Sequence, residues 1–308
     1  MKKIFSYVFA VVFALSSCVA LAAPAADAPQ AECEGLKFAT GPKGKGYSTL
    51  FADIQKVSGG KLALCEINTS GGLDNLNALS TKEADVGIVQ IDTWTDMKNG
   101  DDNVAALQYI MPLNNNYLHV VTSVNGIQGA KKYGFMKGDI KMINRFSDLR
   151  GQPVALVGSA QLLGRRLDKQ LGYGMQFVDV KTDADAFAMV KNGQVAAAFT
   201  VSGWPSGTVK QLNQNDGLTL VPFDAPIGDP YKVKALNYKN IAVYNNNSLA
   251  IQNVLVTRAF TGQRATQVQA LQNVIIKNLT ELKEGNYQPA WNEVNPNSTV
   301  NGMTKLKK

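Results

Sequence analysis

The chain has 308 residues, 45% of them hydrophobic and 18% charged, a length that allows a sizeable core and usually means two domains. Its formal net charge of +7 comes from dispersed basic residues, with TKLKK at the C-terminus as the dense cluster, so the composition argues against a nucleic-acid-binding surface. Three cysteines and one histidine, without HExxH or clustered Cys and His spacing, argue against a zinc site, and the GxSxG motif is absent. We therefore expect no metal, no cofactor and no catalytic centre of a familiar kind.

The N-terminus predicts export. Two lysines precede an apolar run that ends in ALA, a pattern typical of a secretory signal cleaved after residue 22. Residues 1–22 are then the signal peptide and residues 23–34 a mature N-terminal segment, and the loss of two lysines lowers the net charge to +5. The alternative is a lipobox, because LSSC would place a lipid anchor on Cys18. Either way the sequence predicts a periplasmic protein, with ordinary cleavage preferred.

The first element of the mature chain is a predicted strand over Leu36–Thr40, followed by the glycine-rich turn GPKGKGY and a helix with apolar residues at helical spacing. The turn is not a Walker A loop, because no Lys-Ser/Thr pair follows the second glycine. It is not a dinucleotide fingerprint either, because the third glycine is missing. Free N–H groups at the helix start would favour an anionic or acceptor-rich group. The alternative is an ordinary βα loop.

The pattern of strand, turn and helix repeats. A strand is expected over Leu62–Ile67, then the turn NTSGG and a helix, then a strand that ends in VQID. Such alternation predicts a parallel sheet with right-handed crossovers, in which the turns after the strands meet at one edge. Ligands of open α/β sheets bind at that edge.

A second α/β unit begins in the middle of the chain. It contains a predicted strand over Val154–Val157 and a second cycle that ends in AAFTVSGWP. Two β-rich segments, YLHVVTSV and SLAIQNVLVTRAF, connect the units and predict a hinge, and a helix is expected over Gln263–Lys283. We expect lobe 1 to comprise residues 35–122 and 241–308, and lobe 2 residues 123–240.

Two cysteines remain after processing. Cys33 and Cys65 lie at or beside neighbouring strands and would enter an oxidising compartment, so we predict a disulfide between them. A free reactive thiol is the weaker alternative, because catalytic cysteines usually need a histidine. The single histidine, His119, lies in a strand-like run and is expected to be a core or hinge residue.

Two α/β lobes with two crossings predict the two-lobed, type II-like periplasmic binding-protein fold, each lobe a mostly parallel sheet flanked by helices, closing on a small solute. Four segments in order, ATGPKGKGY, SGGLDNLNAL, EADVGIVQID and AAFTVSGWP, also resemble the signatures of the TAXI family, the solute receptors of TRAP transporters. The resemblance extends from about Leu36 to Trp291.

The resemblance implies ligand contacts in lobe 1. Family members usually have Ser where this chain has Ile91, so that hydroxyl is missing here. For the SGG turn, the alternative to a ligand contact is that Ser70 only caps the following helix. The residues matched to the family pattern in this lobe are Thr40, Gly41, Gly46, Tyr47, Ser70, Gly71, Gln90 and Asp92, with Trp94 as a possible wall.

Lobe 2 should supply the opposite wall of the cleft. The candidates are Ser159, Thr200 and Trp204, which lie at or just after predicted strands. The segment GSAQLLG departs from the Gly-x-x-Ser-Gly-Thr pattern of many binding proteins. For Trp204 the alternative is a place in the hydrophobic core. None of the six arginines is placed clearly at a strand-end loop.

The resemblance implies a monomeric receptor that captures a small anionic organic solute, such as glutamate, a dicarboxylate or a 2-oxoacid, and delivers it to a TRAP-type permease. The alternatives are a receptor of an ABC transporter, or a secreted sensor or enzyme on the same fold.

Overall fold

The computed structural model describes residues 34–307 except 130–132, 134–135, 137 and 242–245. The predicted signal peptide, Cys18, Cys33 and nearly all of the segment 23–34 lie outside the described residues. Within the described part, no helix combines the length and the apolar character needed to span a membrane.

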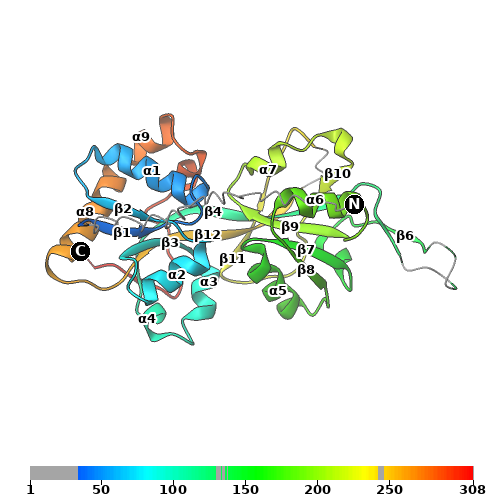
Figure 1. Ribbon diagram of the computed structural model, residues 1–308, viewed down its shortest axis with the longest axis horizontal. Helices are drawn as coiled ribbons and strands as arrows, with labels where there is room; N and C mark the ends of the chain where they lie inside the picture. Colours follow the sequence, from blue (N-terminus) through cyan, green and yellow to red (C-terminus); the bar gives the residue numbers. More distant parts are fainter. Residues whose placement is uncertain (1–33, 130–132, 134–135, 137, 242–245, 308) are drawn as a thin grey trace, which may run out of the picture. The chain divides into compact units, whose positions relative to one another are not determined.

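One large mixed sheet organises the fold, with strand order β2-β1-β3-β12-β4-β9-β7-β8 (Figure 1). Strands β10 and β13 pair with β4, β11 pairs with β12, and β5 and β6 form a separate hairpin. The strands are β1 Leu36–Ala39, β2 Leu64–Ile67, β3 Val86–Gln90, β4 Gln108–Ser123, β5 Ile127–Gln128, β6 Ile140–Lys141, β7 Pro153–Val157, β8 Gln176–Val180, β9 Ala197–Ser202, β10 Leu218–Leu220, β11 Tyr231–Ala235, β12 Asn247–Thr257 and β13 Thr304–Lys305.

Helices flank this sheet on both faces. The helices are α1 Gly46–Ser58, α2 Gly72–Ser80, α3 Ile91–Met97, α4 Asp102–Ala105, α5 Ala160–Leu171, α6 Asp183–Lys191, α7 Gly207–Lys210, α8 Gly262–Lys277 and α9 Leu279–Glu284, with 3-10 turns η1 Phe146–Leu149, η2 Gln214–Asp216 and η3 Pro289–Glu293.

Lobe 1 is built on β1, β2 and β3, which are parallel to one another. One hydrophobic cluster packs α1 and α8 against one face of these strands, around Phe38, Phe51 and Leu271. Another packs α2, α3 and α4 on the other face, around Leu76 and Val89. The apolar spacing along α1 predicted this packing, because residues three and four apart lie on the same side of a helix.

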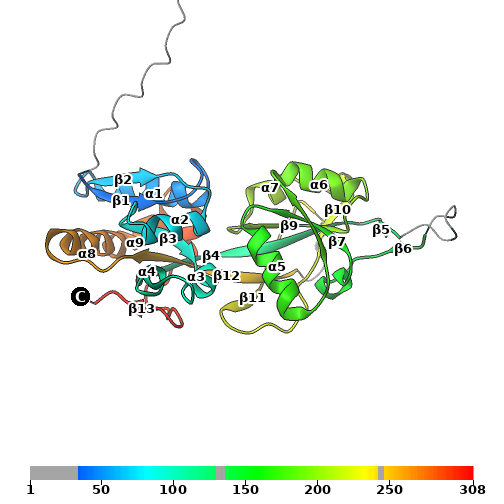
Figure 2. The same ribbon diagram turned by 60° about the horizontal axis from the view of Figure 1, so that its bottom comes forward.

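Lobe 2 repeats the scheme with β7 parallel to both β8 and β9. Helix α5 packs through Leu163 and Leu167 on one face of the sheet, and α6 packs through Phe187 and Val190 on the other. Figure 2 shows α5 and the pair α6 and α7 on opposite sides of the lobe 2 strands. The mostly parallel, two-lobed fold expected from the sequence is thus confirmed.

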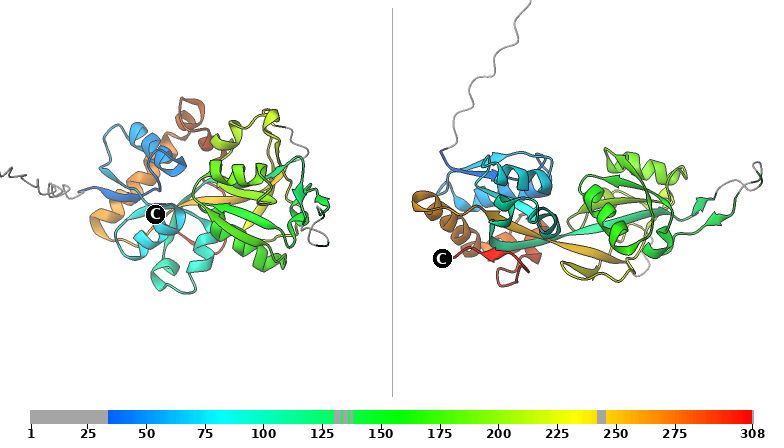
Figure 3. Two further views of the ribbon diagram at one scale, coloured as in Figure 1. Left: turned by 45° about the vertical axis from the view of Figure 1, so that its right-hand side comes forward. Right: turned by 90° about the horizontal axis from the view of Figure 1, so that it is seen from below.

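The long strands β4 and β12 run through both lobes and pair with each other in antiparallel fashion (Figure 3). In β4, residues up to Leu113 pack in the clusters of lobe 1, and residues from Tyr117 pack in those of lobe 2. In β12 the passage from the core of lobe 2 to the core of lobe 1 falls between Ile251 and Val254. The crossing in β4 therefore lies before YLHVVTSV, residues 117–124, the segment expected to form the hinge. That segment belongs to lobe 2, because β9 pairs with residues 117–122 and β10 with residues 121–123.

The structure also differs from the sequence-based expectation at the C-terminal helix. The single helix expected over Gln263–Lys283 is divided into α8 and α9 at Asn278, whose side-chain amide donates to the Val274 carbonyl at 2.8 Å. A polar side chain that bonds the local backbone competes with helix continuation, which explains the break.

Candidate functional site

The turn after β1 depends on glycine at two positions. Gly41 has a φ of +133° and Gly44 a φ of +72°, and a Cβ on Gly41 would lie 3.6 Å from the Gly71 Cα. Gly46, the first residue of α1, has no positive φ, and a Cβ there would meet no atom of the described residues within 4 Å. Gly41 thus lies against the turn at Gly71, whereas Gly46 begins the helix in an ordinary backbone conformation.

These positions allow a matched pair of substitutions. We expect Gly41→Ala to lower the free energy of unfolding by roughly 1–3 kcal/mol, because an L-residue rarely adopts this φ. Gly46→Ala should be neutral or stabilising by up to about 1 kcal/mol, because alanine suits a helix. Urea denaturation of both variants tests this, and equal stabilities would contradict it.

The Thr40 hydroxyl is used inside lobe 1. It donates to Glu66 Oε1 at 2.8 Å, and the Asn68 amide donates to it at 3.4 Å. Thr40 is fully buried. Its side chain therefore joins β1 to the end of β2 in the described arrangement.

Tyr47 connects the first turn to both crossing strands. Its hydroxyl donates to Asn253 Oδ1 at 2.7 Å, and Asn116 Nδ2 donates to the same hydroxyl at 3.1 Å. Asn253 Nδ2 in turn donates to Asn114 Oδ1 at 3.3 Å. Burial, followed by the negative charge of Asp92, raises the pKa of Tyr47 above its usual range, so the phenol stays neutral. We call Tyr47, Asn114, Asn116 and Asn253 the hinge amide cluster.

Two further strand ends of lobe 1 lie nearby in the sheet. Gly71, with a φ of +137°, is the N-cap of α2, whereas Ser70 is exposed and makes no side-chain cap. The alternative in which Ser70 caps this helix is therefore wrong. Gln90 ends β3, is buried, and is paired in register with Asn253 of β12. Gln90 and the hinge amide cluster thus belong to adjacent strands at the same crossing.

Asp92 and Trp94 point in different directions, although both are buried near the start of α3. Two residues along a helix turn the side chain by about 200°, so the two cannot share a face. Trp94 packs with the core of lobe 1, and its indole Nε1 donates to the Val104 carbonyl at 2.9 Å. Asp92 instead forms an ion pair with Arg166 of lobe 2 at 2.7 Å.

Lobe 2 places its candidates at the end of β9 and the start of α5. Thr200 is buried opposite His119, and Trp204 is 36% exposed, so its indole lies outside the core. Ser202 Oγ is buried and has no hydrogen-bond partner among the described residues. A Cβ on the next residue, Gly203, would lie 3.9 Å from Asn114 Nδ2, so this strand end adjoins the hinge amide cluster. Ser159 is exposed at the start of α5 and caps no N–H group with its side chain.

His119 occupies the core of lobe 2, as expected for a structural residue. Its Nε2 lies 2.7 Å from the Tyr238 hydroxyl, which also accepts from the Ser206 N–H at 2.8 Å. The ring is 1% exposed, and burial lowers its pKa to about 4. His119 is therefore neutral at physiological pH.

Several residues of the site are absent from the sequence-based set, namely Asn114, Asn116, Asn253, Arg166, Asp96 and Tyr231. A signal for the amides existed, because NNN in β4 and QN in β12 interrupt otherwise apolar strands. No local signal identified Arg166, because its partners are distant in the chain.

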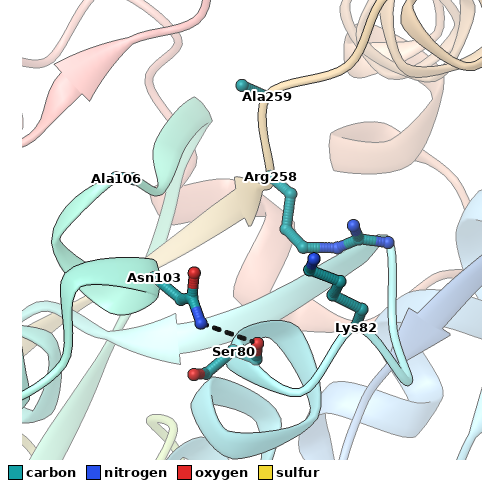
Figure 4. Close-up of a pocket in the computed structure, with 6 residues that line it drawn as sticks. All are labelled: Ser80, Lys82, Asn103, Ala106, Arg258 and Ala259. Carbon is teal, nitrogen blue, oxygen red and sulfur yellow. Dashed lines mark hydrogen bonds between the residues drawn. The ribbon is translucent and has the colours of Figure 1, made fainter.

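A shallow pocket of about 170 Å³ lies elsewhere on lobe 1 (Figure 4). Its lining includes Lys82 and Arg258, but the Arg258 guanidinium already pairs with Asp85 at 2.8 Å and donates to the Ala84 carbonyl. None of the residues proposed from the sequence lines it. Among the described residues, no group of three His, Cys, Asp or Glu side chains is arranged to hold a metal ion.

Comparison with solved structures finds proteins of distant sequence. The amino acid ABC transporter substrate-binding protein AbpA from Streptococcus pneumoniae, bound to L-arginine, is 12% identical with a TM-score of 0.49, over 84% of this chain and 94% of that one. A periplasmic binding protein of an arginine transport system from Legionella pneumophila is 14% identical with a TM-score of 0.46, over 84% and 98%. A histidine kinase sensor domain with similarity to periplasmic binding proteins is 13% identical with a TM-score of 0.46, over 80% and 91%.

The family comparison covers most of the chain. Residues 38–304, from β1 to β13, match the NMT1-like family. The match includes both lobes, both crossing strands and every residue of the hinge amide cluster. The chain belongs to the NMT1-like family.

Proposed function

We propose that this protein is a periplasmic solute-binding protein that takes up a small organic solute between its two lobes and delivers it to a membrane transporter. The observation that carries the proposal is the hinge amide cluster, in which Tyr47 of lobe 1 bonds Asn116 and Asn253 of the two crossing strands. A polar cluster at the crossing gives a solute specific hydrogen-bond partners where hinge motion would enclose it. The predicted export signal supports the same function.

The solute class follows from the polar groups near the crossing. Amide and phenol groups can both donate and accept, so they suit an amino, carbonyl or hydroxyl group. The carboxylate of an amino acid such as glutamate, a dicarboxylate or a 2-oxoacid would then rely on N–H groups of the turns at Gly41 and Gly71. The choice of an anionic solute rests on the sequence resemblance. The lysines of the first turn, Lys43 and Lys45, are exposed and do not by themselves form a binding site for an anion.

The transporter type is the finer part of the proposal. The TRAP type rests on the sequence signatures, whereas two of the similar structures reported above are receptors of transport systems, one of them of the ABC type. The ABC alternative is therefore the better supported of the two. The neighbouring genes distinguish them, because an ABC system needs an ATPase and a TRAP system does not.

A thermal-shift screen of amino acids, dicarboxylates, 2-oxoacids and sugars tests the function. A compound at a hundred times its dissociation constant should stabilise the fold by about 2.7 kcal/mol. NMR of the compound recovered after incubation separates binding from catalysis, because a binding protein returns it unchanged. A screen without any stabilising compound, or a chemically altered compound, would count against a transport receptor.

Tyr47→Phe tests the carrying observation directly. We expect the affinity for a compound found in the screen to fall by about 1–3 kcal/mol, because loss of the hydroxyl leaves the amides of Asn116 and Asn253 without their partner. Tyr287→Phe is the matched control, because its hydroxyl donates to Glu281 on the exposed surface of lobe 1. Calorimetry that gives both variants the wild-type affinity would assign the cluster a structural role only.

A further inference from the structure

An ion-pair cluster joins the two lobes beside the crossing strands. Asp92 and Asp96 lie on α3 of lobe 1, one turn apart, and Arg166 lies on α5 of lobe 2. Arg166 Nη1 is 2.7 Å from Asp92 Oδ2, and Arg166 Nε donates to Asp96 Oδ2 at 2.9 Å, with Nη2 contacting the same oxygen. The guanidinium thus bridges two carboxylates of the opposite lobe.

Tyr231, at the start of β11 in lobe 2, completes the cluster. Arg166 Nη1 donates to its hydroxyl at 2.7 Å, and that hydroxyl donates to Asp92 Oδ2 at 3.3 Å. The other Asp92 oxygen accepts from the N–H and the hydroxyl of Thr93 at 2.7 and 3.3 Å. Both oxygens of Asp92 are therefore occupied by donors of the protein itself.

The cluster is partly removed from water. The side chains of Arg166 and Asp92 are 12% and 4% exposed, while that of Asp96 is 58% exposed. Burial raises the pKa of Asp92, and Arg166 opposes that rise. An ion pair in such surroundings is screened little by salt, and removing one partner leaves a buried, unpaired charge.

The charge balance also bears on recognition. Two carboxylates face one guanidinium, so the cluster offers no unpaired positive charge to an anionic solute. A solute carboxylate could reach Arg166 only by displacing Asp92 or Asp96. The geometry therefore favours a role for Arg166 between the lobes over a role in direct contact with the solute.

We propose that Arg166 is a positioning residue that ties α5 of lobe 2 to α3 of lobe 1 and so sets how readily the lobes close. This inference rests on the proposed function, because closure matters only if a solute binds between the lobes. In this proposal the arrangement in which α3 and α5 meet is the closed one, so the bridge raises the fraction of molecules that are closed, and apparent affinity scales with the fraction that is competent to bind. Arg166 thereby affects solute affinity without touching the solute.

The neighbouring arginine supplies a matched control. Arg165 pairs with Asp179 at 2.8 Å, with both side chains about half exposed, and both residues belong to lobe 2. Arg165→Gln thus removes an identical charge from the same helix without touching the bridge between lobes. The pair of variants separates the effect of the bridge from the effect of net charge.

Small-angle scattering of the protein without added solute is the first test. We expect Arg166→Gln to have a larger radius of gyration than wild type, Asp96→Asn to change it in the same direction by less, and Arg165→Gln to match wild type. Because this measurement needs no solute, a failed solute screen leaves it intact. An unchanged radius of gyration in folded Arg166→Gln and Asp96→Asn would overturn the inference.

The second test distinguishes positioning from contact. For any amino acid, dicarboxylate, 2-oxoacid or sugar that stabilises wild type, we expect affinity weakened on the order of tenfold in Arg166→Gln, largely restored in Arg166→Lys, and unchanged in Arg165→Gln. Arg166→Gln could instead lose binding of carboxylate-bearing compounds alone, with unchanged binding of neutral compounds and an unchanged radius of gyration. That result would mean that Arg166 contacts the solute and would refute the positioning role.

Discussion

Reduction of the predicted Cys33–Cys65 disulfide is expected to lower the free energy of unfolding by roughly 2–4 kcal/mol. The cross-link would close a loop that contains the whole of β1, the first turn and α1, and so would restrict the unfolded chain. Cys65 lies half-buried in β2, in a strand that pairs with β1, while Cys33 lies outside the described residues. The disulfide therefore stays a prediction from the sequence and the compartment.

Mass spectrometry of the unreduced protein purified from the periplasm tests the bond itself. Two thiols open to alkylation without prior reduction would disprove it. Denaturation of the oxidised and reduced protein then measures the stabilisation. The free energy of unfolding of Cys65→Ala should be the same with and without reductant. This control separates the loss of the disulfide from other effects of the reductant.

Acidification from pH 7 to pH 4 is expected to lower the free energy of unfolding by about 3 kcal/mol through His119 alone. Burial lowers the pKa of this imidazole from its ordinary value of 6.5 to about 4. Between these values the unfolded chain carries the proton and the folded chain does not, so stability rises with pH. The contribution is fully present above the unfolded pKa and is lost as the pH falls towards the folded one.

The single histidine of the chain makes this prediction direct to measure. The one imidazole signal in a proton NMR titration should keep its neutral position down to about pH 5. His119→Gln, which can still bond the Tyr238 hydroxyl, should lose this part of the pH dependence in urea denaturation at pH 7, 6, 5 and 4. Equal pH dependence in both proteins would show that His119 titrates normally.

The architecture could be predicted because its signals are local. Strand, turn and helix alternate with the periods of their own secondary structure, and the parallel order within each lobe follows from that alternation. The antiparallel strands at the centre of the sheet are different. The pairing of β4 with β12 joins segments more than a hundred residues apart, which no local pattern encodes.

The site could be predicted only in part, for the same reason. Tyr47 was identified from the turn that precedes it, and it does meet both crossing strands. Trp94 was selected for its position after VQID, but the rotation of a helix turns it into the core. Arg165 and Arg166 are adjacent in the sequence, and only Arg166 contacts the other lobe. It does so from the side of α5 that carries the buried Leu163 and Leu167.

The irregular pairing of β12 with β4 has a mechanical consequence. The register shifts between Gln252 and Val254, at the level of Asn253, where the chain passes from one lobe to the other. Here β4 has the extra residue, because Leu113 and Asn114 stand opposite the single residue Asn253, and such a bulged strand can bend and twist while the regular ladder continues on either side. The lobes are therefore joined by a continuous pair of strands that bends most easily at the bulge, and not by a flexible linker. Opening should be a restrained bend about one axis, with Tyr47 and its amide partners at the bulge as the first groups to report it.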